Sequence, residues 1–118
     1  MATKFSNNAF STLSAGINGS VTTFDVASTS TFPDITDPAD HMYLTIVGSS
    51  DLEIVKVTGL SGSTYTCVRG QDGTSGIAAN GGDRVELRVT SAMLTDALSE
   101  AGPEHIGAGF SIAMSIAL

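Results

Sequence analysis

The sequence has 118 residues, enough for one small domain with a modest hydrophobic core. Hydrophobic residues make up 42% and charged residues only 14%, and 13 residues are glycine, which favours a β-rich fold with many turns and argues against disorder. A net charge of −7 with five scattered basic residues excludes nucleic acid as a partner, and no apolar run is long enough to cross a membrane.

The N-terminal part predicts a polar extended arm over residues 2–8, followed by a hairpin. Residues 9–17 and 21–28 both alternate in polarity and predict its two strands. Asn18-Gly19 between them supplies a tight turn, because both residues tolerate a positive φ. The segment 29–41 is rich in hydroxyl groups and aspartate, has no period, and predicts a loop.

The middle of the chain predicts the β core. Four runs alternate with the period of two that is typical of strands: Met42–Val47, Glu53–Thr58, Thr64–Arg69 and Arg84–Thr90. The first of these is apolar on both faces, which predicts a central strand covered on both sides. The other three form a meander, joined by a turn at Gly59–Ser63 and a glycine-rich loop at Gly70–Asp83. That loop is long enough to serve as a contact surface in a small domain.

Two further elements follow the meander. Ser91–Ala101 has apolar residues at helical spacing, Thr90 or Ser91 can cap its N-terminus, and Gly102-Pro103 ends it. Residues 108–118 then alternate large apolar with small side chains and predict a C-terminal strand. An exposed apolar edge invites pairing, so this strand needs cover from its own domain, a sister subunit or a larger assembly.

Together these elements predict one domain over residues 1–118. It comprises the arm at 2–8, a β core at 9–90, a helix at 91–101 and the strand at 108–118. We expect a mainly β, sandwich or barrel-like fold of about six to eight short antiparallel strands with one short helix.

The predicted loop at 29–41 contains residue types that could bind a cation. Asp34, Asp37 and Asp40 are spaced three residues apart and precede His41 in the sequence. Calcium loops alternate their ligands more closely and end in a bidentate glutamate, which this loop lacks. We interpret these residues as solvated acids that cap turns, and we expect no metal site.

Other candidate groups have structural interpretations too. The glycines of the Gly70–Asp83 loop neither precede a phosphate-loop lysine nor open a helix, so no nucleotide or other cofactor is expected. Cys67 has only His41 and His105 as possible partners, both in expected loops, which favours a buried thiol over a nucleophile. A pocket joining one of these histidines to a carboxylate and a hydroxyl would favour an enzyme. Surface ion pairs of little energetic weight are expected for Arg69, Arg84 and Arg88, with Asp72, Asp83 or Glu86.

The ionisable groups are few and spread along turns, whereas an active site needs convergent ones. We therefore expect no catalytic residues and no enzymatic activity. The N-terminus lacks the apolar core of a secretion signal, which predicts synthesis in a cytoplasm.

One block of the sequence resembles a module found in virion proteins of tailed bacteriophages. The block reads E-I-V-K-V-T at 53–58, S-G-S-T-Y-T-C-V-R-G-Q-D-G-T at 61–74 and G-D-R-V-E-L-R-V-T at 82–90, with a loop of small residues before the last part. The likeness extends over residues 4–98. Cys67 departs from it, standing where a valine is usual.

In that family the module occurs near the start of tail-fibre or tail-tip proteins and in small stand-alone virion proteins. The resemblance implies a packing and attachment role and no catalytic residue. Because no fibre-type extension follows Leu98, we expect a small repeated subunit. The first expectation is a virion structural protein, assembled in the bacterial host cytoplasm, that stabilises the head as a capsid decoration (cement) subunit. The alternatives are a tail, neck, baseplate or tail-fibre adaptor module and, with less support, a carbohydrate-binding module for host adhesion.

The expected partners are the phage major capsid protein or tail proteins, and the expected state is a homo-oligomer, preferably a trimer. The polar arm could add a strand to a partner sheet, while the C-terminal strand could bury its apolar face against sister subunits. The expected interface residues are Lys4, Phe5, Phe110, Ile112, Met114, Ile116 and Leu118.

Overall fold

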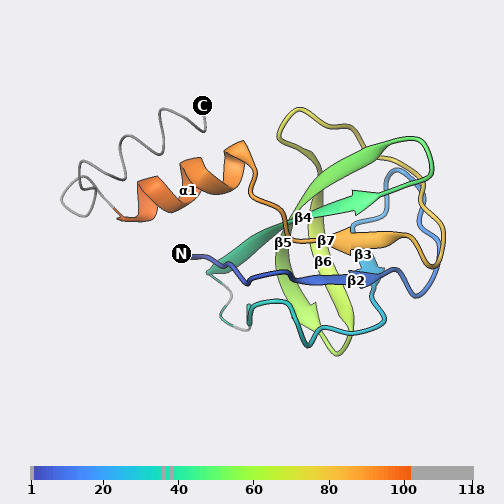
Figure 1. Ribbon diagram of the computed structural model, residues 1–118, viewed down its shortest axis with the longest axis horizontal. Coiled ribbons are helices and arrows are strands. Elements are labelled where there is room, and N and C mark those ends of the chain that lie inside the picture. Colours follow the sequence, from blue (N-terminus) through green and yellow to red (C-terminus); the bar gives the residue numbers. More distant parts are fainter. Residues whose placement is uncertain (1, 36, 38, 102–118) are drawn as a thin grey trace.

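The computed structural model describes residues 2–35, 37 and 39–101. The fold is mainly β, with antiparallel strands in a curled half-barrel sheet and one short helix, which confirms the expected class (Figure 1). The strands are β1 (Ala2–Thr3), β2 (Phe10–Thr12), β3 (Thr23–Asp25), β4 (Asp40–Val47), β5 (Leu52–Ser61), β6 (Thr64–Gln71) and β7 (Arg84–Glu86), and the helix is α1 (Ser91–Ala101). The strand expected at 108–118 lies outside the described residues.

The sheet curls until its two outer strands meet. The strand order is β2-β7-β4-β5-β6-β3, and β1 pairs with β4 in parallel. Beyond the ends of β2 and β3, Leu13 and Val26 form an antiparallel bridge. The Ser14 amide donates to the Asp25 carbonyl and the Ala27 amide to the Thr12 carbonyl, both at 2.9 Å. Some of the backbone groups that an open sheet would expose at these edges are therefore paired.

The strands β4, β5 and β6 form the centre of the sheet, and β4 is buried along nearly its whole length. Side chains two residues apart share a face, so alternate positions of these strands fill the inside of the curl. The fully or almost fully buried side chains there are Met42, Leu44, Ile46, Val55, Val57, Tyr65, Cys67 and Val85. Each large apolar side chain buried in this way stabilises the fold by about 1.5–3 kcal/mol. The predicted central position of β4 is confirmed.

The predicted N-terminal hairpin forms only in part. β2 pairs with β7 and β3 pairs with β6, so the two segments lie at opposite ends of the strand order. They meet at the antiparallel bridge between Leu13 and Val26 and at the bond from the Ser28 amide to the Ser11 hydroxyl. The outer sides of β6 and β7 need partners, and pairing there satisfies more backbone groups than a local hairpin would.

Two strand boundaries also differ from the sequence pattern. β7 ends at Glu86 instead of Thr90, and Val89 is 73% exposed. The Leu87 amide donates to the Ala9 carbonyl at 3.0 Å, so the chain after β7 still contacts the N-terminal segment. β4 begins at Asp40, inside the predicted loop, because β1 supplies a partner there.

The N-terminal arm is partly docked on the domain. β1 pairs with Asp40 and His41, the Lys4 amide donates to the His41 carbonyl at 2.8 Å, and Thr3 is only 7% exposed. The expectation of a polar arm available along residues 2–8 is therefore wrong for its first residues. Their backbone groups are already used within the domain.

Helix α1 follows β7 and extends beside the N-terminus (Figure 1). The Met93 amide donates to the Thr90 hydroxyl at 3.2 Å, which confirms the predicted cap. The Met93 side chain is fully buried. Among the described residues, no helix is long and apolar enough to cross a membrane.

Candidate functional site

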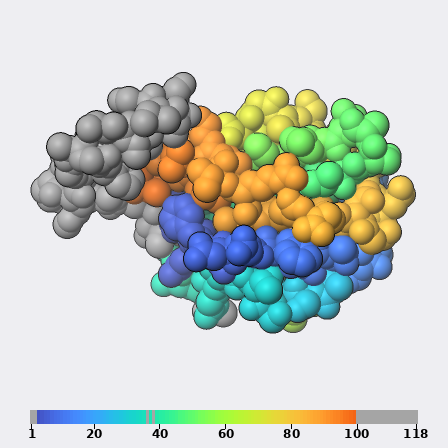
Figure 2. Space-filling model, in the orientation of Figure 1, coloured from blue at the N-terminus to red at the C-terminus, as the bar shows by residue number. Residues whose placement is uncertain are grey.

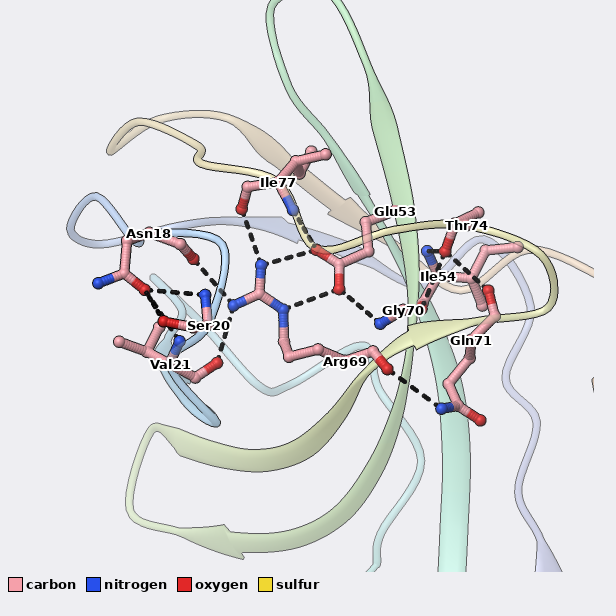
Figure 3. A network of polar contacts seen from close by, with 10 residues as sticks. All are labelled: Asn18, Ser20, Val21, Glu53, Ile54, Arg69, Gly70, Gln71, Thr74 and Ile77. Atoms are coloured by element: carbon pink, nitrogen blue, oxygen red, sulfur yellow. Dashed lines mark hydrogen bonds and ion pairs between the residues drawn. The ribbon is translucent and has the colours of Figure 1, made fainter.

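A buried ion pair between Glu53 and Arg69 connects two loops to the centre of the sheet (Figure 3). Glu53 lies opposite Ile46 in the β4–β5 register and is fully buried. Its Oε2 accepts from the Arg69 Nε and the Gly70 amide, both at 2.8 Å. Its Oε1 accepts from the Arg69 Nη2 at 2.7 Å and the Ile77 amide at 2.9 Å. The carboxylate is therefore satisfied on both oxygens.

Arg69 uses its remaining donors on backbone carbonyls. The Nη1 donates to Asn18 at 2.9 Å and to Val21 at 2.7 Å, and the Nη2 donates to Ile77 at 2.7 Å. With the bonds to Glu53, all the N–H donors of the guanidinium are engaged. Residues 18–21 are held in a turn by the Asn18 side chain, which accepts from the Ser20 and Val21 amides.

The electrostatics keep both partners charged. Burial alone would raise the pKa of Glu53, but the hydrogen bonds from Arg69, Ile77 and Gly70 outweigh it and lower that pKa. The hydrogen bond to Glu53 raises the pKa of Arg69 against the opposing effect of burial. A buried pair with complete hydrogen bonding offsets its desolvation cost, whereas one partner left alone would not.

The loop after β6 is further fixed by Thr74 and by glycines. The Thr74 hydroxyl accepts from the Ile54 amide at 2.9 Å and donates to the Gln71 carbonyl at 2.7 Å. At Gly76 the Gly19 carbonyl oxygen would lie 2.1 Å from an added Cβ, so a larger residue cannot fit without moving the backbone. The contact-surface candidate Gly70–Asp83 is thus a loop with a defined shape.

The expectation that Arg69 forms a weak surface pair is wrong. Its side chain is 10% exposed and its partner is Glu53. The sequence contained the signal: Glu53 is in phase with Val55 and Val57, and Arg69 with Tyr65 and Cys67, so opposite charges occupy inward positions of adjacent strands. We call these contacts the Glu53–Arg69 network. Several residues of the phage-like block, including Glu53, Arg69, Gly70 and Thr74, serve this structural purpose.

A second polar cluster surrounds His41, which is 2% exposed. Its Nε2 lies 3.0 Å from the Asp96 Oδ2 and 3.1 Å from the Thr3 hydroxyl, and the Tyr43 hydroxyl donates to the same Oδ2 at 2.6 Å. The cluster joins α1 to β1 and β4. The sequence pattern did not indicate this cluster, because it predicted a loop at His41, which lies in β4.

This cluster brings a histidine, a carboxylate and hydroxyls together, the combination that would favour an enzyme. In a catalytic triad the nucleophile and the orienting acid bind different ring nitrogens. Here the Thr3 hydroxyl and Asp96 meet the same Nε2, while Nδ1 is buried with no hydrogen-bond partner among the described residues. The three surface grooves found among the described residues are not lined by Thr3, His41 or Asp96. The arrangement supports a structural role in holding the helix.

The acidic group of the 29–41 loop is dispersed. The Asp37 carboxylate accepts from the Ala39 amide at 2.9 Å and so caps a turn, while Asp40 pairs with Lys4 at 3.6 Å. His41 instead faces Asp96. Within the described part of the chain, no three potential metal ligands come together.

The predicted buried position of Cys67 is confirmed, with the side chain on the inner face of β6. Burial raises the pKa of this thiol to about 11, with a smaller opposing effect from Arg69. A thiol in this environment is a poor nucleophile near neutral pH.

A third group lies on the outer face of β2 and β7. Arg84 and Arg88 both bind the Glu86 carboxylate, which confirms their expected surface pairing. Hydrogen bonds from Arg84 and then Arg88 lower the pKa of Glu86. The Arg84 guanidinium also lies 4.4 Å from the centre of the Phe10 ring. The contribution of Phe10 could not be found from the sequence, because it depends on the pairing of β2 with β7.

The residues expected at an interface are only partly described. Lys4 contacts Asp40 within the domain, and Phe5 is 51% exposed beside it. The remaining expected interface residues, at 110–118, lie outside the described residues.

No protein-family model matches the chain, and no curated protein is similar to it at a significant level.

Proposed function

We propose that the chain is a non-enzymatic structural subunit of a tailed-bacteriophage virion, and that it decorates the capsid. The observation that carries the proposal is where the phage-like block lies in the fold. Glu53, Arg69, Gly70 and Thr74 belong to one network that locks loops to the sheet. The block thus specifies a stable scaffold, which supports the packing and attachment role that the resemblance implies.

The requirements of a cement protein support the same proposal. Such a subunit must keep its shape while it bridges neighbouring capsid proteins, and the Glu53–Arg69 network ties together segments that lie far apart in the sequence. Large apolar side chains remain exposed for contacts: Phe5, Phe10, Leu52, Val68 and Val89. In this proposal the partners are the major capsid protein and sister copies in a trimer, and the location is the virion.

Immunogold labelling of intact virions tests the location. Antibodies against the purified chain are applied to particles of the phage that encodes it, and labelling over the head surface is the expected result. Head particles from a deletion mutant should lose the label and regain it when the purified chain is added. Particles without label, whose protein content also lacks the chain by mass spectrometry, would contradict a virion role.

A tail, neck, baseplate or tail-fibre adaptor is the second candidate, because the phage-like block also occurs near the start of tail-fibre and tail-tip proteins. Gold label restricted to the tail would favour it over decoration. A carbohydrate-binding module has less support, because the rings of Phe24, Phe32 and Tyr65 are buried and unavailable for stacking on sugars. Binding of the purified chain to sugars on a glycan array would favour the carbohydrate-binding role.

A further inference from the structure

We propose that the outer face of β2 and β7 binds an acidic segment of a partner protein that carries an apolar side chain next to its carboxylate. The binding surface consists of three charged residues, Arg84, Glu86 and Arg88, which we call the arginine fork, and of Phe10 beside them. The inference rests on the proposed function only in taking the partner to be another virion protein. It specifies which face of the domain binds that partner and what kind of segment the face recognises.

The fork is built by strand geometry. Arg84 and Glu86 are two residues apart on β7 and therefore point to the same side, and Arg88, which follows the strand, reaches the same Glu86 carboxylate. The Arg84 Nε binds the Glu86 Oε2 at 2.5 Å, and the Arg88 Nε binds the Oε1 at 2.8 Å. The Glu86 carboxylate thus binds one guanidinium group on each of its oxygens and limits the motion of both groups.

The terminal nitrogens of these guanidinium groups remain available. Among the described residues, the Arg84 and Arg88 side chains form hydrogen bonds only through Nε. They are 52% and 45% exposed, whereas the Glu86 side chain between them is 20% exposed. Arg69, in contrast, has no donor left. Paired N–H groups of arginine match the two oxygens of a carboxylate, so the fork is preorganised for one.

The charge balance also favours an acidic partner. Two arginines against one glutamate leave the fork locally positive on a chain whose net charge is −7. Complementary charge increases the rate and the specificity of association more than its strength. Nucleic acid carries the same kind of anionic oxygen, but the strongly acidic chain repels a polyanion.

An apolar surface lies beside the fork. Phe10 is 48% exposed, and the Arg84 guanidinium lies over its ring. An open groove of about 350 Å³ runs here, lined by Asn8, Ala9, Phe10, Arg84, Glu86 and Leu87. In Figure 2 the blue N-terminal segment lies directly against the orange segment that contains β7. A partner side chain placed in this groove would contact the Phe10 ring while its neighbouring carboxylate reaches the fork.

Recognition must proceed through side chains, because the backbone of β2 is occupied. The Thr31 hydroxyl accepts from the Phe10 amide at 3.2 Å and donates to the Phe10 carbonyl at 3.0 Å. The Thr12 carbonyl accepts from the Ala27 amide at 2.9 Å. A partner strand therefore cannot extend the sheet at Phe10 without displacing residues 28–31.

Peptide titration of the isotope-labelled full chain, followed by NMR, tests the fork. The probe is the capped peptide Leu-Asp-Phe-Asp-Leu, and its control has asparagine in place of both aspartates. The acidic peptide should shift the amide signals of residues 8–10 and 84–88 and bind about tenfold more tightly than its control, as expected when charged hydrogen bonds are lost. Equal binding of the two peptides, or shifts elsewhere on the domain, would overturn the proposal.

Variants with matched charge separate the fork from net charge. Arg88→Gln should weaken binding of the acidic peptide about tenfold, and Arg88→Lys should weaken it less, because lysine keeps the charge but loses the planar pair of donors. Lys56→Gln removes one positive charge from β5 and should leave binding unchanged. Equal losses in Arg88→Gln and Lys56→Gln would show a general charge effect and overturn the assignment.

Two further titrations address other occupants. Inorganic phosphate that binds the same residues as tightly as the acidic peptide would overturn the choice of a protein segment. Concentration-dependent shifts at the fork in the chain alone would assign the surface to a second copy and also overturn it. A chain that labels the virion but ignores the peptide contradicts this inference alone, whereas a chain that binds the peptide but is missing from virions contradicts the proposed function alone.

Discussion

Glu53 and Arg69, on adjacent strands, meet inside the curled sheet with the Glu53 Oε1 2.7 Å from the Arg69 Nη2. The pair also binds the backbone at Asn18, Val21, Gly70 and Ile77, so two loops depend on it. A cross-link of this kind defines the shape of one end of the domain. Its removal should therefore affect global stability and not only one loop.

Glu53→Gln should lower the free energy of unfolding by about 3–5 kcal/mol, because it leaves the buried Arg69 charge without its counter-charge. Urea unfolding followed by circular dichroism provides the measurement. The matched control is Glu86→Gln, which breaks the partly exposed pairs with Arg84 and Arg88 and should cost about 1 kcal/mol. Similar losses in the two variants would contradict a special role for the buried pair.

Acid should destabilise the protein through the same carboxylates. The pKa values of Glu53 and Glu86 are lowered in the folded state from the ordinary value of 4.5. The unfolded chain therefore takes up protons first, and the stabilisation is complete above that value and is lost as pH falls through the folded pKa values. Unfolding free energies measured from pH 7 down to pH 3 should fall in the wild type and fall less in Glu53→Gln. Parallel curves for the two proteins would be inconsistent with this assignment.

Cys67 should be unreactive in the folded protein. Burial raises the pKa of its thiol to about 11, so very little thiolate exists at pH 8, and the side chain is only 3% exposed. A disulfide reagent such as Ellman's reagent should release its chromophore slowly from the native chain and at once after addition of denaturant. Rapid reaction of the native chain, at a rate comparable to glutathione, would rule out the buried position.

Asp96 should hold α1 against the sheet through its bonds to His41 and Tyr43. Asp96→Ala removes the carboxylate that binds both His41 and Tyr43 and should cost about 1–3 kcal/mol of local stability. Hydrogen exchange of the amides at 93–99 should accelerate, while exchange in β4 changes little. Thr95→Ala, at an exposed position of the same helix, is the control and should leave exchange nearly unchanged. Equal acceleration in both variants would point to helix propensity instead.

Residues 108–118 should mediate oligomer formation, as their alternation of large apolar and small side chains predicts. A chain that ends at residue 107 should lose its oligomeric mass in light scattering while it keeps its β-type circular dichroism. A shuffled segment of the same composition, without the alternation, serves as the control. An unchanged mass after deletion would exclude this segment as the interface.

Strands β4, β5 and β6 and helix α1 were predictable because their signals are local. A period of two or of 3.6 residues appears whenever one face is buried, and the Thr90 cap follows from one hydroxyl at a helix start. Partners of short strands were not predictable in this way. β2 and β3 have only a few residues each, too few for a pattern to distinguish a local hairpin from pairing with distant strands.

By itself, the sequence determined the fold class, the central strands, the capped helix and the buried position of Cys67. Each of these follows from the periodicity or polarity of neighbouring residues. The tertiary structure alone decided that Arg69 meets Glu53, that Thr3 and Asp96 meet at His41, and that Phe10 lies beside Arg84. Such contacts form only when the sheet curls and segments distant in the chain become adjacent, and the need to pair buried charges and backbone groups then selects the partners.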